Sequence, residues 1–427
     1  MSGISKIRFN TLDQWLDWQA GLHPREIELG LERVARVWRR LRPAGLRRPV
    51  VTVAGTNGKG SCVAMLESIY RQAGYRVCTY TSPHLVRYNE RIRLDGRPVD
   101  DDSLCAIFEA IDRARGDTSL TYFEFGTLAA LSLFAEARPD LVILEVGLGG
   151  RLDAVNIVDA DLALITTVDL DHTDWLGESL EAIALEKAGI MRSQRPVILA
   201  DPRGPEVLLS EAQRKGARAS LAGRDFGFRA SPPGWQWLGP DGHHLELPLP
   251  ALPGAIQLQN AAAVVAACRL LGDRLPVTDA AIAAGIAGVV LPGRMQWLPG
   301  PPAVLMDVAH NPQAVASLLS SLSRYPHEGI QAIFGLLKDK DAAGVAQLMA
   351  ERVDGWHLVD LPGGRGRAAR DLAEILRSSG VAAHIAIYRD FAEAFRGASG
   401  AAGTDDLVLV FGSFILVGEA MQHLAIE

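Results

Sequence analysis

Short runs that are apolar at almost every position alternate with segments of helical periodicity along most of this chain. Residues 141–146 and 162–168 are the clearest apolar runs. Strands that are apolar throughout are typical of a parallel sheet whose two faces are both covered by helices. Helical periodicity is evident at residues 61–73, 103–115 and 124–137. The alternation therefore predicts an α/β fold.

Two clusters of proline and glycine, at residues 291–293 and 299–302, interrupt this alternation and predict a linker. The chain has 427 residues, which is enough for two or three domains at roughly 100–200 residues per domain. We therefore expect a larger domain over residues 1–295 and a smaller α/β domain over residues 296–427.

Two other segments depart from the regular pattern. Residues 235–238 and 243–247 flank the turn sequence Pro-Asp-Gly, which predicts a small β hairpin appended to the sheet of the first domain. Residues 397–403 are rich in glycine and alanine, and we expect a surface loop there.

The composition excludes several classes of protein. With 48% hydrophobic and 22% charged residues, the chain is not disordered, collagen-like or a disulfide scaffold. A net charge of −7 argues against a dedicated nucleic-acid binder, and the four cysteines lack zinc-site spacing. Residues 1–19 lack the apolar core of a secretory signal, and the longest uncharged stretch, residues 247–268, contains three prolines. We therefore expect a cytoplasmic protein without a membrane or nucleic-acid partner.

A glycine-rich segment, Val51-Thr-Val-Ala-Gly-Thr-Asn-Gly-Lys-Gly-Ser61, follows a predicted strand and opens a predicted helix. Backbone N–H groups in such a turn surround the positive end of the helix and bind phosphate. Lys59 can reach the outer phosphates of a nucleotide, and the Ser61 hydroxyl can contact a phosphate or a magnesium ion. The segment departs from the common phosphate-binding pattern at Val53 and Gly60, so a glycine-rich turn without a ligand is the alternative.

Three ionisable residues downstream extend this hypothesis. Glu145 ends one apolar run and His172 follows another, which places both at the carboxyl edge of a parallel sheet, where ligands bind. Taken alone, His172 is typical of a hydrogen-bonded structural histidine, but its position beside Glu145 and the glycine-rich segment favours a functional role. Lys187, at the end of a predicted helix, would by itself be interpreted as an exposed cation.

The sequence Gly-Thr-Asn-Gly-Lys-Gly-Ser resembles the signature of the Mur ligase superfamily, whose members join a carboxylate to an amino acid at the expense of ATP. Other segments resemble the folylpolyglutamate synthase/dihydrofolate synthase family, specifically its bacterial bifunctional type, over nearly the whole chain. The matching segments are residues 29–34, 55–61, 82–91, 120–124, 145–156, 171–177, 186–190, 291–294, 307–312 and 338–341.

The resemblance implies an N-terminal P-loop ATPase-type domain with a parallel sheet and a smaller, Rossmann-like C-terminal domain. It implies a ligase that adds L-glutamate to 7,8-dihydropteroate and to tetrahydrofolates through an acyl phosphate. It also implies ATP as co-substrate, Mg²⁺ as cofactor, K⁺ as a further candidate cation, and a monomer whose partners are small molecules.

The resemblance also assigns roles to individual residues. It implies that ATP contacts Thr56, Asn57, Gly58, Lys59, Gly60, Ser61, Asn260, Arg294 and Asp307. It implies that dihydropteroate or folate contacts Ile27, Glu28, Leu29, Thr121, Tyr122, Phe123, Glu124, Leu152, Asp153 and Ala154. The implied metal ligands are Ser82, Glu145, His172 and Lys187, with Lys187 carbamylated. Lys59, Lys187, His172 and His310 are the implied catalytic residues, and His310 is expected to orient glutamate or its amine.

Three alternatives to the bifunctional ligase stay open. A folylpolyglutamate synthase without dihydrofolate synthase activity would carry the same motifs. A peptidoglycan ligase of the superfamily is disfavoured because such enzymes place a substrate domain before the nucleotide loop, and 54 residues precede Gly55 here. A nucleotide-binding regulator would not need Glu145, His172 and Lys187 together.

A cluster of arginines precedes the glycine-rich segment. Leu31, Val34, Trp38 and Leu41 recur among these arginines at helical spacing, which predicts a helix with one buried face and a solvated basic face. The arginines of the cluster are Arg33, Arg36, Arg39, Arg40, Arg42, Arg47 and Arg48.

Overall fold

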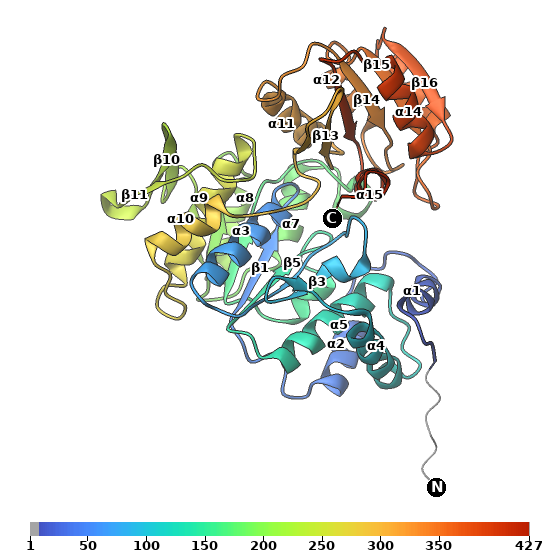
Figure 1. Cartoon of the computed structure of the whole chain (residues 1–427). Helices are drawn as coiled ribbons and strands as arrows, with labels where there is room; N and C mark the ends of the chain where they lie inside the picture. The colour runs from blue at the N-terminus through green and yellow to red at the C-terminus, as the bar shows by residue number, and fades with distance from the viewer. Residues whose placement is uncertain (1–7, 427) are drawn as a thin grey trace.

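The computed structural model describes residues 8–426. The segment for which no secretory signal is expected, residues 1–19, lies partly outside the described residues, because residues 1–7 are not described. The chain forms two α/β parts, with the C-terminal part above the N-terminal part in Figure 1. The predicted α/β fold with a large, mainly parallel sheet and a smaller second sheet is confirmed.

The N-terminal sheet has eight strands in the order β4-β3-β2-β5-β1-β6-β7-β8. All neighbouring pairs are parallel except β2–β3 and β3–β4 at one edge. The strands are β1 (Val50–Ala54), β2 (Val77–Tyr80), β3 (Ile92–Leu94), β4 (Arg97–Pro98), β5 (Leu141–Glu145), β6 (Leu162–Ile165), β7 (Pro196–Leu199) and β8 (Arg218–Leu221).

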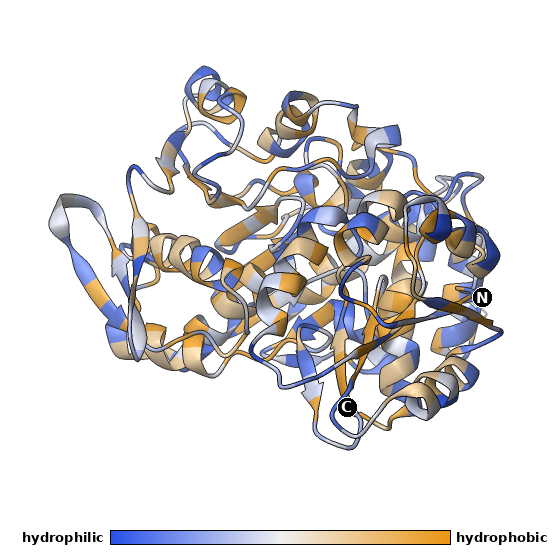
Figure 2. Ribbon diagram, turned by 90° about the horizontal axis from the view of Figure 1, so that it is seen from above, coloured by the Kyte–Doolittle hydropathy of each residue, from blue (hydrophilic) through white to orange (hydrophobic). Residues whose placement is uncertain are grey.

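Helices cover both faces of this sheet, as the apolar strands predict (Figure 1). Alternate residues of β1 enter different cores, with Val50 and Ala54 on one face and Val51 and Val53 on the other. The first face is covered by α1 (Leu12–Ala20), α2 (Glu32–Leu41), α4 (Asp101–Arg115), α5 (Tyr122–Ala137), α7 (Leu180–Ala188) and α8 (Val207–Lys215). The second face is covered by α3 (Lys59–Gln72), α9 (Ile256–Leu270) and α10 (Asp279–Ala287). Figure 2 shows hydrophobic colouring on the interior strands.

The hairpin predicted near residue 240 is part of a separate sheet. Strands β9 (Gly227–Ser231), β10 (Gly234–Leu238) and β11 (His244–Leu247) form a three-stranded antiparallel sheet that is not joined to the eight-stranded one. It packs on α9 through Trp237, whose indole N–H donates to the carbonyl of Ala262 at 3.0 Å. The predicted hairpin is confirmed as the pair β10–β11, but its attachment to the large sheet was wrong, because it belongs to a separate sheet that packs on α9.

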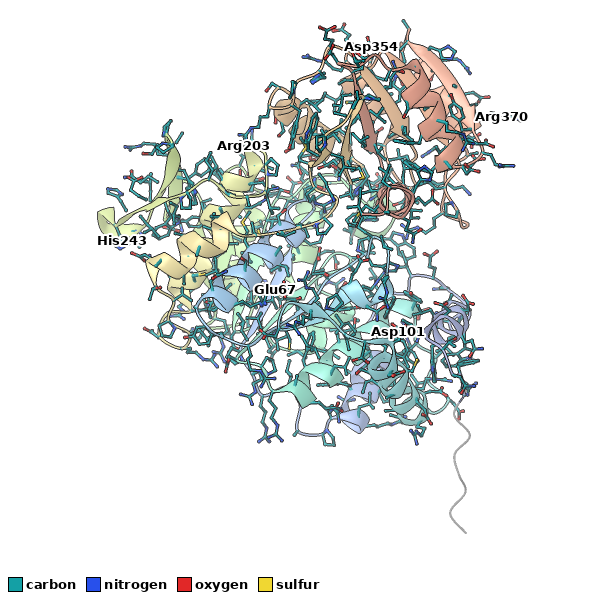
Figure 3. The ribbon with its side chains drawn as sticks, viewed as in Figure 1. Glu67, Asp101, Arg203, His243, Asp354 and Arg370 are labelled. Atoms are coloured by element: carbon teal, nitrogen blue, oxygen red, sulfur yellow. The ribbon has the colours of Figure 1, made fainter. Side chains whose placement is uncertain are left out.

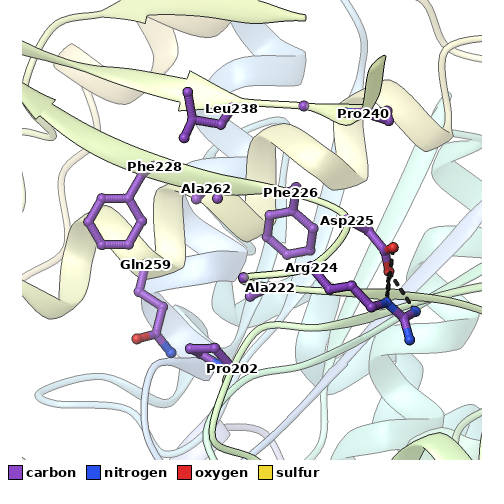
Figure 4. Close-up of a pocket in the computed structure, with 13 residues that line it drawn as sticks. Pro202, Ala222, Arg224, Asp225, Phe226, Phe228, Leu238, Pro240, Gln259 and Ala262 are labelled. Atoms are coloured by element: carbon purple, nitrogen blue, oxygen red, sulfur yellow. Dashed lines mark hydrogen bonds and ion pairs between the residues drawn. The ribbon is translucent and has the colours of Figure 1, made fainter. Parts of the chain in front are cut away.

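A cavity of about 620 Å³ lies beside this small sheet. Figure 4 shows Phe226, Phe228 and Leu238 along its wall, with the ion-paired Arg224 and Asp225 at one end. Gln259 lines both this cavity and the candidate site described below.

The C-terminal sheet has six strands in the order β12-β13-β17-β14-β15-β16, all parallel except β12. The strands are β12 (Gln296–Leu298), β13 (Ala303–Asp307), β14 (Ile330–Phe334), β15 (Gly355–Val359), β16 (His384–Tyr388) and β17 (Leu407–Phe411). The helices that pack on it are α11 (Pro312–Leu322), α12 (Ala342–Met349), α13 (Ala369–Ser378), α14 (Phe391–Ala401) and α15 (Phe414–His423).

Two sequence predictions for this part were wrong. Residues 299–302 are not part of a linker but the turn between the paired strands β12 and β13, whereas residues 291–293 lie between α10 and β12. Residues 397–401 are not a loop but the last turns of α14, where a Cβ on Gly397 would lie 2.2 Å from the Tyr388 hydroxyl. The glycine leaves room for the Tyr388 ring of β16 and does not mark a turn of the chain.

None of the helices within residues 8–426 combines the length and apolarity needed to span a bilayer.

The close packing of α10 against α3 predicts a stability difference between two glycines. A Cβ at Gly285 would lie 2.5 Å from the Ile69 Cα, whereas a Cβ at Gly400, near the end of α14, would meet open space. We expect Gly285→Ala to cost about 1–3 kcal/mol through overpacking. Gly400→Ala should be neutral or stabilise by up to about 1 kcal/mol through helix propensity.

Thermal unfolding followed by circular dichroism checks this prediction. The Gly285→Ala protein should have a midpoint several degrees below that of the native protein, with Gly400→Ala as the matched control. Equal midpoints for the two variants would show that α10 and α3 are not packed as described.

Candidate active site between the two sheets

The carboxyl ends of strands from both sheets meet across one cleft. The glycine-rich loop follows β1, Ser82 follows β2, and Glu145 ends β5. On the opposite side His310 follows β13 and Ser413 follows β17. Ligands of open parallel sheets bind at this edge. The fold therefore brings residues of two separate parts of the chain to one candidate site.

The glycine-rich loop is held in a conformation that its glycines make possible. Gly58 has φ 93°, and a Cβ there would lie 2.7 Å from the Asn260 side-chain oxygen. The hydroxyls of Thr166 and Thr167 donate to the carbonyl of Asn57 at 2.7 and 3.1 Å. Helix α3 begins at Lys59, two residues earlier than the pattern predicted, so the free N–H groups of its first turn face this loop.

Lys59 lies beneath the loop. Its ammonium donates to the carbonyls of Gly55 at 3.0 Å and Thr56 at 3.2 Å. Burial lowers its pKa, while the carboxylates of Glu145 and Asp171 act in the opposite sense. The charge of Lys59 is thus placed where the phosphates of a nucleotide would meet the helix end.

The residues predicted to contact ATP line two adjoining cavities. Asn57, Gly58, Ser61, Asn260, Arg294 and Asp307 line a cavity of about 210 Å³. Thr56, Lys59 and Gly60 line a cavity of about 140 Å³, which Asn57, Gly58 and Arg294 also border. Arg203, labelled in Figure 3 and not predicted from the sequence, lies at the wall of the larger of the two.

Arg294 and Asp307 form the part of this site contributed around β12 and β13. The Asp307 carboxylate accepts from the N–H groups of Met295 at 2.9 Å and Ala309 at 2.8 Å. Burial lowers the pKa of Arg294, and the nearby Asp307 acts to raise it. One terminal nitrogen of Arg294 is buried without a hydrogen-bond partner among the described residues. An anionic ligand such as a phosphate would supply that partner.

The four residues predicted as metal ligands all line the cavity of about 140 Å³. Ser82 donates its N–H to the Glu145 carboxylate at 3.4 Å, and burial raises the pKa of Glu145. Within residues 8–426 no group of three or more His, Cys, Asp and Glu side chains is arranged to hold a metal. The set Ser82, Glu145, His172 and Lys187 therefore fits a magnesium ion only if Lys187 becomes an oxygen donor, because Mg²⁺ prefers oxygen ligands.

Lys187 is buried and has a pKa lowered to about 7 by burial and by the charge of Lys59. The exposed position that its sequence context alone suggests was wrong, since the last turn of α7 faces the cavity. A neutral amine is the form that reacts with carbon dioxide to give a carbamate, so this burial favours the predicted modification.

A pair of residues that the sequence did not single out joins the two sides of the cleft. Lys340 donates to Asp171 at 2.6 Å and lies 3.2 Å from His172 Nε2. Asp339 lies 3.4 Å from His172 Nδ1. Burial opposes ionisation of Asp171, but Lys340, His172 and His310 together lower its pKa below the usual range. Residues 338–341 matched the family, but a motif alone did not show that they reach a loop 169 residues earlier.

Amide side chains add a second connection across the cleft. Asn57 donates to Asn311 at 3.2 Å and to Gln313 at 2.5 Å. Asn311 in turn donates to Asp171 at 3.2 Å. The nucleotide loop therefore contacts the N-terminal end of α11 directly.

A third cavity, of about 460 Å³, lies on the other side of His172 and His310. All ten residues predicted to contact dihydropteroate or folate line it, together with Lys340, Arg365, Ser413 and Phe414 from the C-terminal part. His172 and His310 line both this cavity and the one bordered by Lys59. A ligand in the cavity of about 460 Å³ can thus present one end to the phosphate-binding region.

Carboxylates provide hydrogen-bond acceptors in this cavity. Asp153 accepts from the N–H groups of Leu148 at 2.8 Å and Val155 at 3.0 Å, and burial raises its pKa to about 6. Glu124 accepts from the N–H of Thr121 at 2.8 Å through one oxygen. Acceptors of this kind suit a heterocycle that carries amino and ring N–H donors.

Comparison with known proteins agrees with this arrangement. The Mur ligase middle domain matches residues 53–268, and the Mur ligase glutamate ligase domain matches residues 293–414. The dihydrofolate synthase/folylpolyglutamate synthase of Escherichia coli (strain K12) is 45% identical over 96% of this chain and 95% of its own length.

Solved structures give the same result. E. coli FolC in complex with DHPP and ADP superposes with a TM-score of 0.91 at 44% identity, covering 97% of this chain and 98% of that one. A bifunctional folylpolyglutamate synthase/dihydrofolate synthase with Mn, AMPPNP and L-glutamate bound has a TM-score of 0.89 at 43% identity, with the same coverage. Those proteins bind a nucleotide, and the second also binds a divalent metal.

The lowered pKa of Lys187 predicts that this side chain takes up carbon dioxide. With ¹³C-bicarbonate, the protein should show a carbamate signal by NMR that increases as the pH rises through about 7, because the neutral amine then predominates. The Lys187→Arg protein is the matched control and should lack the signal. Identical spectra from the two proteins would contradict the prediction.

Proposed function

The chain belongs to the dihydrofolate synthase/folylpolyglutamate synthase family of Mur ligases, and from this premise we propose that it adds L-glutamate to 7,8-dihydropteroate and to tetrahydrofolates. It is an ATP-dependent ligase. The observation that carries the proposal is the shared boundary of the two cavities at His172 and His310. That boundary would place the acceptor carboxylate beside the γ-phosphate of ATP.

The proposed reaction has two steps. A carboxylate is a poor electrophile, so an oxygen of the acceptor carboxylate first attacks the γ-phosphorus of ATP, releasing ADP and forming an acyl phosphate. The glutamate amine then attacks the acyl carbon, and inorganic phosphate leaves with the former carboxylate oxygen. Phosphoryl transfer depends mainly on alignment and charge neutralisation. Lys59 and Arg294, which both line the cavity of about 140 Å³, would supply positive charge.

The metal ligands are proposed from the same cavity. Ser82, Glu145, His172 and carbamylated Lys187 would hold Mg²⁺, which would neutralise phosphate charge and help to orient the transferred group. The Mn bound to a relative supports a divalent cation. K⁺ is a further cation that we propose without assigning residues to it.

His310 is proposed to handle the incoming amine. Its Nδ1 lies 2.9 Å from the Val308 carbonyl, which can only accept, so the ring proton is assigned to Nδ1. Burial and the charge of Lys340 lower the pKa of His310 to about 4, so the ring is neutral at pH 7. The lone pair on Nε2 can then accept a proton from the attacking amine.

The remaining assignments follow from this function. Residues 1–295 would bind ATP and the pteroate or folate acceptor, and residues 296–427 would complete the site and receive glutamate. We propose a cytoplasmic monomer whose partners are ATP, L-glutamate, dihydropteroate and folates. The net charge of −7 supports the absence of a nucleic-acid partner.

An assay of ADP release with product masses tests the proposal. With ATP, Mg²⁺ and glutamate, both dihydropteroate and tetrahydrofolate should gain one glutamate mass per ADP released in the first round. The Lys59→Met protein should lose this activity by a large factor, on the order of a hundredfold or more, because transition-state charge is no longer neutralised.

The other outcomes separate the alternatives. Extension of tetrahydrofolate alone would identify a folylpolyglutamate synthase without the dihydrofolate synthase activity. Nucleotide binding without mass gain by either acceptor would refute the proposed reaction and favour a nucleotide-binding regulator.

A further inference from the structure

Arg33 belongs to the arginine cluster of the sequence, but its side chain is more buried than the sequence pattern predicts. Helix α2 buries Val34, Val37 and Trp38, and the arginines were expected on the solvated face. Arg36 follows that expectation and is exposed, whereas the Arg33 side chain is only 22% exposed. The prediction that Arg33 lies on the solvated face of the helix was therefore wrong. Its guanidinium points to the segment that lines the cavity of about 460 Å³.

The guanidinium connects two elements of that cavity wall. One terminal nitrogen donates to the Glu28 carboxylate, and the other donates to the Glu28 backbone carbonyl at 2.9 Å. The second nitrogen also lies 3.2 Å from Glu124 Oε1. Glu28 precedes α2 and Glu124 lies in the first turn of α5, so the Arg33 side chain connects the two elements. Arg33 itself does not line the cavity, whereas Glu28 and Glu124 do.

Glu124 is the carboxylate with unused acceptor capacity. One of its oxygens accepts from Thr121, and the other, Oε1, is buried and has the ion pair with Arg33 but no hydrogen bond within the described residues. Both oxygens of Asp153 already accept backbone N–H groups. A ligand that carries N–H donors would add to this ion pair the hydrogen bond that Oε1 lacks. The pterin ring has such an edge, with an amino group beside a ring N–H.

We propose that Arg33 is a positioning residue for recognition of the acceptor substrate, acting through Glu124. One terminal nitrogen holds Glu124 Oε1 toward the donor edge of the pterin ring, and the contacts with Glu28 fix the orientation of the guanidinium. A lysine would keep the charge and lose the fork geometry. The inference rests on the proposed function, because it concerns the acceptor of that reaction.

The test is a comparison of kinetic constants for Arg33→Met and Arg33→Lys. Arg33→Met should raise KM for dihydropteroate by about tenfold or more through the loss of charge-assisted contacts to a buried carboxylate. The kcat and the KM for ATP should stay within about twofold, because these contacts lie away from the phosphates. Arg33→Lys should recover part of the KM, and Arg36→Met, on the exposed face of the same helix, is the matched control.

A double-mutant cycle with Glu124→Gln separates positioning from general stability. If Arg33 acts through Glu124, Arg33→Met should change KM by less than about twofold in the Glu124→Gln background. Should Arg33→Met fail to fold, the cycle is run with Arg33→Lys. The inference would be overturned if the effects of the two substitutions on KM multiplied in the double mutant, or if the KM for dihydropteroate did not change. It would also be overturned if kcat fell and the KM of every substrate rose by the same factor.

Activity of the native protein in the same assay distinguishes this failure from a failure of the proposed function. Suppose that the native protein and Arg36→Met add glutamate normally and that the Arg33 variants have the same kinetic constants. That result would refute the role of Arg33 and leave the proposed function intact. Absence of glutamate addition by the native protein would refute the proposed function, and with it the inference.

Discussion

The ion pair between Lys340 and Asp171 is the interaction on which the geometry of the site depends. Lys340 is almost completely buried, and its ammonium lies 2.6 Å from Asp171. A buried ammonium is costly unless it is paired, and the partner here belongs to the other sheet. The pair therefore favours one relative position of the two parts of the chain. In that position His172 and His310 come to the boundary of two cavities.

Charge is distributed across the cleft in a way that suits the proposed chemistry. Cationic groups, Lys59 and Arg294, line the cavities assigned to the nucleotide, and carboxylates line the cavity assigned to the acceptor. Burial also changes pKa values in these cavities. It lowers the pKa of Lys187 to about 7 and raises the pKa of Asp153 to about 6. The proposed ligase therefore differs from a simple nucleotide switch in having a second cavity, lined by carboxylates and by Lys340 and Arg365, that adjoins the phosphate region.

The sequence predicted those features that depend on local pattern. Apolar runs located the strands of both sheets, and the glycine-rich motif located the nucleotide loop. Features that depend on contacts distant in sequence were missed or misjudged. The Lys340–Asp171 pair spans 169 positions, and no local signal shows it. Arg33 and Lys187 looked like surface cations because periodicity does not show which carboxylate or cavity a long side chain reaches. Gly397 looked like a loop residue because close helix packing and chain reversal both require glycine.

The central claim is that phosphoryl transfer to a carboxylate occurs where the two cavities meet. The most direct measurement uses dihydropteroate labelled with ¹⁸O in its carboxylate, with ATP, Mg²⁺, glutamate and mass analysis of the phosphate released. Because the acyl phosphate loses phosphate together with a carboxylate oxygen, each inorganic phosphate should carry one ¹⁸O atom for each glutamate added. Unlabelled phosphate released alongside newly formed dihydrofolate would contradict the account.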